Sequence, residues 1–190
     1  MSEDEDDEGP PGLPPGTPFY MTPAGHIALR EEARKLWDEE RPKVVEVVSW
    51  AAGLGDRSEN ADYQYGKRRL RQIDSRVRFL RKRLERVQVV DPATQTRRDQ
   101  VFFGATVTYA RASDDAEVTI TIVGVDEADS SNGRISWVAP VARALLGAHV
   151  GDTRKLRTPA GAETIEVVAI AYPIGPFIFV GQMGPGDTSV

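Results

Sequence analysis

Two helical patterns, separated by a glycine-rich turn, occupy the first half of the chain. Thr22-Pro23 is a typical helix start, because Thr can cap a helix and Pro suits its first turn. Apolar residues at steps of three and four then predict a helix that runs to about Ala52. Pro42 removes one backbone donor and clashes with the preceding turn, so we expect a kink or short break near Arg41.

The second helix has the clearest apolar pattern in the chain and is predicted to begin within residues 56–59. Its seam alternates steps of three and four residues, as in a coiled coil. The members of the seam are Tyr63, Gly66, Leu70, Ile73, Val77, Leu80, Leu84 and Val87. Because a short turn makes two long helices antiparallel neighbours, the pattern predicts a hairpin of about 45 Å from tip to base.

From about residue 101 the pattern changes from helices to strands. Alternating apolar residues predict strands at 101–109, 117–125, 134–138 and 164–171, with a short helix at 141–146. The expected fold class is therefore α+β: an antiparallel helical hairpin (coiled coil), followed by a small α+β domain with a mostly antiparallel sheet.

Both ends of the chain differ from this folded pattern. Residues 1–19 are acidic and then rich in Pro and Gly, and they carry too little apolar surface to offset the entropy of ordering. We predict a disordered tail at 1–19, the hairpin at 20–91, the second domain at 96–173 and a Gly-rich tail at 174–190. The short apolar patch at 177–180 has no assigned role.

Composition excludes several kinds of site and predicts a compartment. The chain has no cysteine, so disulfides and thiolate metal sites are excluded. No apolar run approaches the roughly 20 residues of a membrane helix, and the N-terminus is acidic where a secretory signal would be basic. The sequence therefore predicts a cytoplasmic protein.

The formal net charge of -5 hides a strongly basic second helix. Residues 66–86 carry ten bases and two acids, and the first helix has too many bases of its own to neutralise them. One interpretation is a solvated face paired with acids of the first helix. The other is phosphate contact, chiefly by Lys67, Arg68, Arg69 and Arg71 near the tip, although bases and aromatics do not interleave as in single-strand stacking platforms.

Six acids at residues 3–8 raise a related question about the free protein. They could fold back onto the basic helix near Arg81, Lys82, Arg83 and Arg86, or they could act only as a solubilising tail.

The turn between the helices carries two acids, Asp56 and Glu59, with two open interpretations. Asp-x-x-Glu is a helix-capping pattern, in which Asp56 accepts from backbone amides and Glu59 reaches back. The same carboxylates could bind Mg²⁺, which often takes only one or two protein carboxylates plus water and phosphate. Spacing alone favours capping.

Several stretches resemble one known family, the Gre transcript cleavage factors. They are Leu36-Trp37-Asp38-Glu39-Glu40-Arg41-Pro42, Leu54-Gly55-Asp56-Arg57-Ser58-Glu59-Asn60-Ala61-Asp62-Tyr63-Gln64-Tyr65, Val101-Phe102-Phe103-Gly104-Ala105, Ala142-Arg143-Ala144-Leu145-Leu146 and Thr158-Pro159-Ala160-Gly161. The form Gly-Asp-Arg-Ser-Glu-Asn-Ala-Asp-Tyr is similar to the GreB branch. The resemblance covers about residues 20–173.

The resemblance implies a partner and a reaction. The second domain would be FKBP-like and dock on bacterial RNA polymerase near its secondary channel, and the coiled coil of a monomeric protein would enter that channel. Asp56 and Glu59 would act as catalytic carboxylates that share Mg²⁺ with the polymerase and help it hydrolyse backtracked RNA. Asn60 and Tyr63 would support the tip, and the extruded RNA 3′ segment would contact the bases. The free protein would hold no metal tightly and would not be a nuclease.

One loop departs from the family, and two other functions remain as alternatives. Where the family usually has a polar residue and Ser before a Pro, this chain has Trp137, Val138, Ala139 and Pro140, which predicts a more apolar docking loop with Trp137 as an anchor. The first alternative is a non-cleaving regulator that occupies the same channel. The second is a prolyl isomerase, although an FKBP-like fold would not imply that activity.

Overall fold

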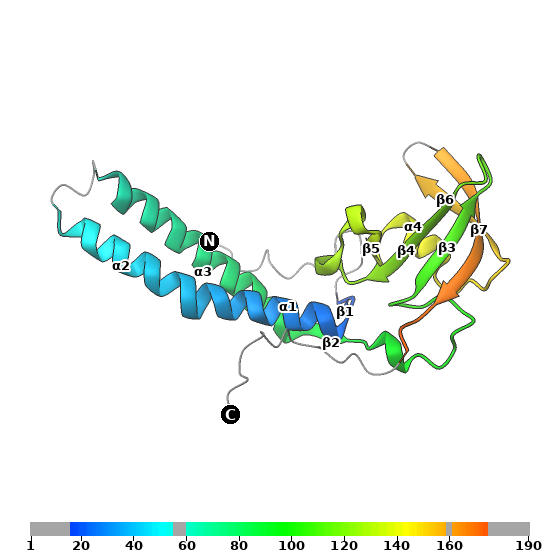
Figure 1. Cartoon of the computed structure of the whole chain (residues 1–190), viewed down its shortest axis with the longest axis horizontal. Coiled ribbons are helices and arrows are strands. Elements are labelled where there is room, and N and C mark those ends of the chain that lie inside the picture. Colours follow the sequence, from blue (N-terminus) through cyan, green and yellow to red (C-terminus); the bar gives the residue numbers. More distant parts are fainter. Residues whose placement is uncertain (1–15, 55–59, 159–160, 175–190) are drawn as a thin grey trace, which may run out of the picture.

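The predicted hairpin and the predicted sheet form two parts that meet at the base of the hairpin (Figure 1). The computed structural model describes residues 16–54, 60–158 and 161–174. The Gly-rich tail and most of the acidic tail lie outside these ranges. Phe19, which the sequence placed in the disordered tail, is buried in strand β1 (Phe19–Met21).

The first arm of the hairpin is a helix with one irregular segment. Helix α1 (Pro23–Arg34) begins where predicted, and the Thr22 side chain accepts a hydrogen bond from the Gly25 amide at 3.1 Å. A π-helical segment, Lys35–Glu40, connects α1 to α2 (Arg41–Ala52). Where a kink or short break was expected near Arg41, the helix instead contains this π-helical segment, which ends at Glu40, and Pro42 occupies the first turn of α2.

The second arm begins later than the sequence predicted. Helix α3 (Ala61–Arg86) has Asn60 as its cap, because the Asn60 side chain accepts a hydrogen bond from the Tyr63 amide at 3.1 Å. The start predicted within residues 56–59 is wrong for this helix. Asp56 and Glu59 themselves lie outside the described residues.

The predicted seam joins the two arms. Gly66, Ile73, Val77 and Leu80 are buried, and the other four members of the seam are half-buried. Gly66 permits the closest approach, since a Cβ at this position would lie 2.4 Å from Cγ2 of Val48 on α2.

The second domain contains a five-stranded sheet with the order β5-β4-β3-β7-β6 (Figure 1). Its elements are β3 (Thr106–Arg111), β4 (Glu117–Val123), β5 (Arg134–Ser136), α4 (Pro140–Leu145), β6 (Thr153–Thr158) and β7 (Gly161–Ala171). All neighbours are antiparallel except β4 and β5. The expected α+β class with a mostly antiparallel sheet is confirmed. No helix in the described ranges is long and apolar enough to cross a bilayer.

Two details of the sheet differ from the sequence prediction. The strand expected from residue 101 starts only at Thr106, because Gly104 turns the chain with a φ of +82° and donates its amide to the Ile122 carbonyl. Strand β6 was missed, since it carries three bases and only one buried apolar side chain, Leu156. The core of the domain includes Val107, Leu145 and Ile165, which are fully buried.

A buried carboxylate connects the two parts. Glu127 is the one charged side chain that is buried among the residues the structure describes. Its carboxylate accepts hydrogen bonds from the amide of Thr22 at 2.9 Å, from the Thr22 hydroxyl, and from the amide of Gly124 at 3.0 Å. A Cβ at Gly25 would lie 2.3 Å from this carboxylate. The start of α1 is therefore held directly against the sheet domain.

The close contact at Gly66 predicts a specific loss of stability. Gly66→Leu should lower the free energy of unfolding by about 2–3 kcal/mol, because the added atoms overlap the stiff, β-branched Val48. Urea denaturation measures this change. In a Val48→Ala background the cost should shrink, whereas Val45→Ala, which alters an exposed side chain on the same helix, should not relieve it. Equal costs in both backgrounds would contradict this packing.

Candidate functional site

One side chain closes the tip of the hairpin. The Asn60 Nδ2 group donates a hydrogen bond to the Ala51 carbonyl at 3.0 Å, while its Oδ1 caps α3. Asn60 therefore ties the last turn of α2 to the first turn of α3. The acidic segment with Asp56 and Glu59 lies between these two anchored points in the sequence, and the roles predicted for both acids stay predictions.

The tip also exposes large apolar side chains. Tyr63 is half-buried, and the Lys67 ammonium lies 5.3 Å from the centre of its ring. Trp50 and Leu54, near the end of α2, are each 61% exposed, and Tyr65 is 71% exposed. This end of the hairpin therefore offers apolar surface as well as charge.

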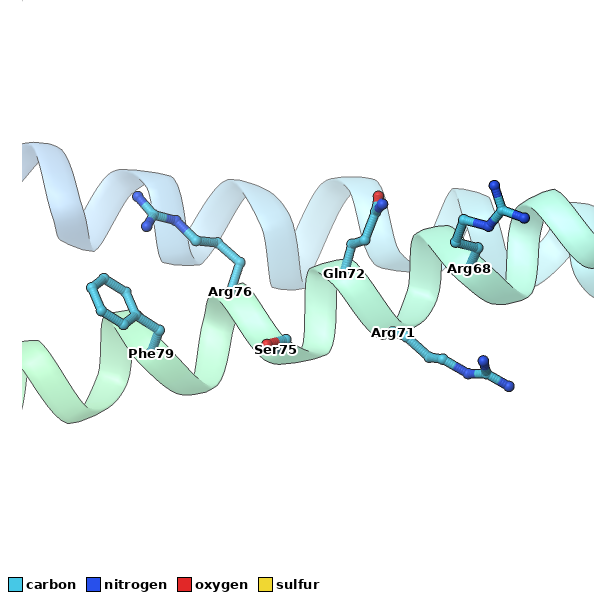
Figure 2. Close-up of a pocket in the computed structure, with 6 residues that line it drawn as sticks. All are labelled: Arg68, Arg71, Gln72, Ser75, Arg76 and Phe79. Carbon is cyan, nitrogen blue, oxygen red and sulfur yellow. The ribbon is translucent and has the colours of Figure 1, made fainter. Parts of the chain in front are cut away.

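A shallow groove lies along α3, on the side of the hairpin that the sequence predicted to bind phosphate (Figure 2). Its volume is about 570 Å³, and it is lined by Arg68, Arg71, Gln72, Ser75, Arg76 and Phe79. Figure 2 shows Arg68, Gln72 and Arg76 extending from one side of α3 and Arg71 from the other. The groove combines cations with one aromatic ring.

Ion pairs divide the bases of α3 into two groups. Arg69 pairs with Glu40 at 2.6 Å, Arg76 with Glu32 at 2.7 Å and Arg83 with Asp126 at 3.3 Å. These three bases recur every seven residues, so they form one row facing the first arm and the base. The hydrogen bond to Glu32, the largest cause, raises the pKa of Arg76 further above its usual value.

The second group has no carboxylate partner in the part of the chain that the structure describes. It includes Arg68, Arg71 and Arg78, which are all exposed. Lys67 and Arg81 also belong to it, and they lie over the rings of Tyr63 and Trp37. Of the four predicted phosphate contacts, Arg68 and Arg71 line the groove, Arg69 is held by Glu40, and Lys67 lies over Tyr63. Pairing with acids of the first arm is therefore confirmed for Arg69 and Arg76, and phosphate contact by the other bases stays a prediction.

The predicted phosphate contacts did not include four residues of the groove: Gln72, Ser75, Arg76 and Phe79. Phe79 is 39% exposed and lies between two guanidinium groups, with Arg76 at 5.1 Å and Arg83 at 5.0 Å from the ring centre. The expectation that no aromatic interleaves with the bases is therefore wrong at this position. The available signal was that Phe79 falls outside the seam formed by Val77 and Leu80.

The predicted docking loop is partly used by the fold itself. The Trp137 amide donates to the Val123 carbonyl at 2.9 Å, and its ring meets Tyr20 of β1 edge-on at 5.4 Å. Val138 and Ala139 are half-buried, and Pro140 is exposed at the start of α4. Trp137 thus packs between the sheet domain and the hairpin base, which leaves its predicted role as an anchor untested.

No cluster of three or more metal-binding side chains exists within the described ranges. The two acids of the tip lie outside those ranges. A pair of carboxylates fits an ion that is shared with a partner better than an ion held by this chain alone.

Comparison with known proteins identifies the family. The model described as "Transcription elongation factor, N-terminal" matches residues 19–89, and "Transcription elongation factor, GreA/GreB, C-term" matches residues 95–172. Transcription elongation factor GreB of Neisseria meningitidis serogroup A is 54% identical over 156 residues, covering 82% of this chain and 95% of that protein. GreB of Pseudomonas aeruginosa is 51% identical over 163 residues, covering 85% and 94%.

Solved structures that the chain matches include Gfh1 of Thermus thermophilus and a GreA/GreB factor of Nitrosomonas europaea. The first is 22% identical with a TM-score of 0.38, and covers 82% of this chain and 99% of its own. The second is also 22% identical, with a TM-score of 0.36 and coverage of 81% and 99%.

The helical hairpin and the small α+β domain correspond to the two regions that the family models match. Together these matches define the class of this protein, the transcription elongation factors. The chain belongs to the GreA/GreB family, and the relatives described above place its similarity in the GreB branch.

The two bonds of Asn60 can be separated experimentally. Asn60→Ala should lower stability by about 1 kcal/mol and speed hydrogen exchange at the Tyr63 amide, because the cap is lost. Asn60→Ser keeps a good cap but is too short to bridge to the Ala51 carbonyl, so Tyr63 should stay protected. Normal exchange at Tyr63 in the Ala variant would show that Asn60 is not the cap.

Proposed function

We propose that this elongation factor binds bacterial RNA polymerase through its secondary channel and stimulates the polymerase to cleave backtracked RNA. The observation that carries the proposal is the shape of the site. Helices α2 and α3 form a long hairpin whose arms Asn60 ties together at the far end, and Asp56 and Glu59 lie between α2 and Asn60 in the sequence. An arm of this kind suits the delivery of acidic groups into a deep channel.

The chemistry of the tip follows from what two carboxylates can do. Phosphodiester hydrolysis is helped by divalent ions that stabilise the attacking and leaving oxygens. Asp56 and Glu59 would contribute ligands to Mg²⁺ in the polymerase active centre, and the polymerase would supply the others. On its own, the protein would therefore be neither a nuclease nor a tight Mg²⁺ binder.

The basic groove would contact the RNA that backtracking extrudes. Arg68 and Arg71 would meet phosphates, since no carboxylate of the described chain competes for them. Phe79 offers a ring face for a base at the far end of the same groove. Arg69 would contribute mainly by holding the two arms together through Glu40.

The sheet domain would dock outside the channel and set the depth of the hairpin. Val138, Ala139 and Pro140 form the surface of the loop before and at the start of α4, and they give this contact its apolar character. Trp137 would support that surface from beneath through its contact with Tyr20.

The acidic tip generates the most direct mutational prediction. Asp56→Asn and Glu59→Gln should each lower stimulated transcript cleavage by at least about tenfold, because an amide is a poorer Mg²⁺ ligand than a carboxylate. Polymerase affinity should stay within about twofold, since docking does not need the charge. Both values come from cleavage and competition assays on stalled, backtracked complexes.

The same assays distinguish the alternative function. If a variant cleaves like wild type, the metal role of that residue is wrong. If wild type binds polymerase and inhibits it without cleavage, the chain is a non-cleaving regulator of the channel.

The difference between paired and unpaired bases of α3 generates a second prediction. Arg68→Ala combined with Arg71→Ala should weaken binding of single-stranded RNA and lower the salt dependence of the logarithm of the binding constant by about 1.4. Arg69→Ala is the control, since it removes one positive charge from a paired base. It should leave the salt slope nearly unchanged and lower stability instead. If the salt slope of RNA binding is the same in the double variant and in the control, the unpaired bases do not differ from the paired base in RNA contact.

A further inference from the structure

The base of the hairpin sets the direction from which the N-terminal segment arrives. Strand β1 pairs in parallel with β2 (Val87–Val89), with Phe19 opposite Val87. Because β2 directly follows α3, both strands run away from the tip. The residues before Phe19 therefore enter from the side of α3 and not from the sheet domain.

Side-chain contacts place this entry point against the last turns of α3. The Arg83 guanidinium lies 4.1 Å from the centre of the Phe19 ring, and that of Arg86 lies 5.7 Å from it. Phe19 itself is buried. The N-terminal segment therefore starts from a fixed point beside the basic helix.

The surface next to this point carries cations that the described chain leaves without carboxylate partners. Arg78, Arg71 and Arg68 follow one another from the base toward the tip, and all three side chains are exposed. Arg71 and Arg68 line the groove from its two sides (Figure 2). The acids of the first arm do not serve them, since Glu32 and Glu40 already pair with Arg76 and Arg69. The exposed face therefore has an excess of positive charge along much of the helix.

The chain itself contains an anion of the right length. Residues 3–8 are all acidic and are followed by a spacer rich in Pro and Gly. From Glu8 to Gly16, eight residues at about 3.1 Å each would span about 25 Å. At about 1.5 Å per residue, Arg78 is about 13 Å from Val87 along the helix and Arg68 about 28 Å. The acids can therefore reach Arg78, Arg71 and Arg68.

We propose that the acidic segment at residues 3–8 lies along the exposed face of α3, over Arg78, Arg71 and Arg68, and covers the groove in the free protein. The segment competes with phosphates for the same cations. Individual exposed ion pairs are weak, but several act together and a short tether gives an effective concentration in the millimolar range. This inference rests on the proposed role of the groove only in naming RNA as the competitor.

The contact can be measured without RNA, because the chain has no cysteine to interfere with labelling. Donor and acceptor dyes are attached to Ser2→Cys and to Ser75→Cys, which lines the groove. Energy transfer should be high at low salt and fall at about 1 M salt, where the Debye length is about 3 Å. A variant with residues 3–8 changed to Asn and Gln should give the low value throughout.

A second labelled pair controls for general compaction. The pair Ser2→Cys with Ser131→Cys, which is exposed on the sheet domain, should respond less to neutralisation of the acids than the groove pair. If native and neutralised tails give the same transfer from the groove at low salt, the acids do not cover this face and the proposal is wrong.

RNA binding tests the competition itself. If the segment covers the groove in about two thirds of molecules, neutralising it should tighten single-stranded RNA binding about threefold at low salt. The gain should vanish at high salt and in the Arg68→Ala, Arg71→Ala background. If neither protein binds RNA while energy transfer still depends on the acids, the RNA role of the groove fails and the intramolecular contact stands. Equal RNA affinities at low salt would overturn the competition.

Discussion

The structure depends on one narrow apolar seam between two helices whose other faces are largely polar. On α3, full burial is confined to Gly66, Ile73, Val77 and Leu80. Toward the tip the seam is thinner, since α2 buries only Ala51. A hairpin with so small a core needs additional bonds to keep its ends in place.

Those bonds lie at the two ends of the arm. At the tip, Asn60 joins the last turn of α2 to the first turn of α3. At the base, the Glu127 carboxylate receives the amide and hydroxyl of Thr22 and so holds the start of α1. A buried carboxylate is tolerated only when its hydrogen bonds are satisfied, so this contact also resists any other placement of the arm. The hairpin thus behaves as an extension of the sheet domain.

Between these ends, ion pairs determine which charges remain for a partner. The row of Arg69, Arg76 and Arg83 strengthens the seam and the base through Glu40, Glu32 and Asp126. The neighbouring bases Arg68, Arg71 and Arg78 point elsewhere and give the arm its basic face. One helix therefore combines a structural row and an interaction surface, separated by roughly 100° to 160° around the helix axis.

Sequence reasoning predicted the elements whose signals are local. The Thr22 cap, the seam of α3 and the fold class all follow from spacing and residue type. The cap of α3 was misplaced, because Asp56 and Glu59 match a capping pattern as well as Asn60 does. Strands β1 and β2 were missed, since each has three residues and its partner lies far away in the sequence.

Other features require the register between elements, which no single segment contains. The pairing of Arg69 with Glu40 depends on how the two helices align, and the contact of Trp137 with Tyr20 depends on how the domains meet. For the same reason, the sequence assigned Arg69 to phosphate and treated Trp137 as an external anchor.

The proposed function requires that the hairpin makes RNA polymerase, and not the protein itself, cleave RNA. The decisive measurement is the rate of transcript cleavage in purified, backtracked elongation complexes with Mg²⁺, with and without this protein, beside RNA mixed with the protein alone. Cleavage should be faster only when polymerase and protein are both present. No acceleration in the complete mixture, or cleavage of RNA by the protein alone, would contradict it.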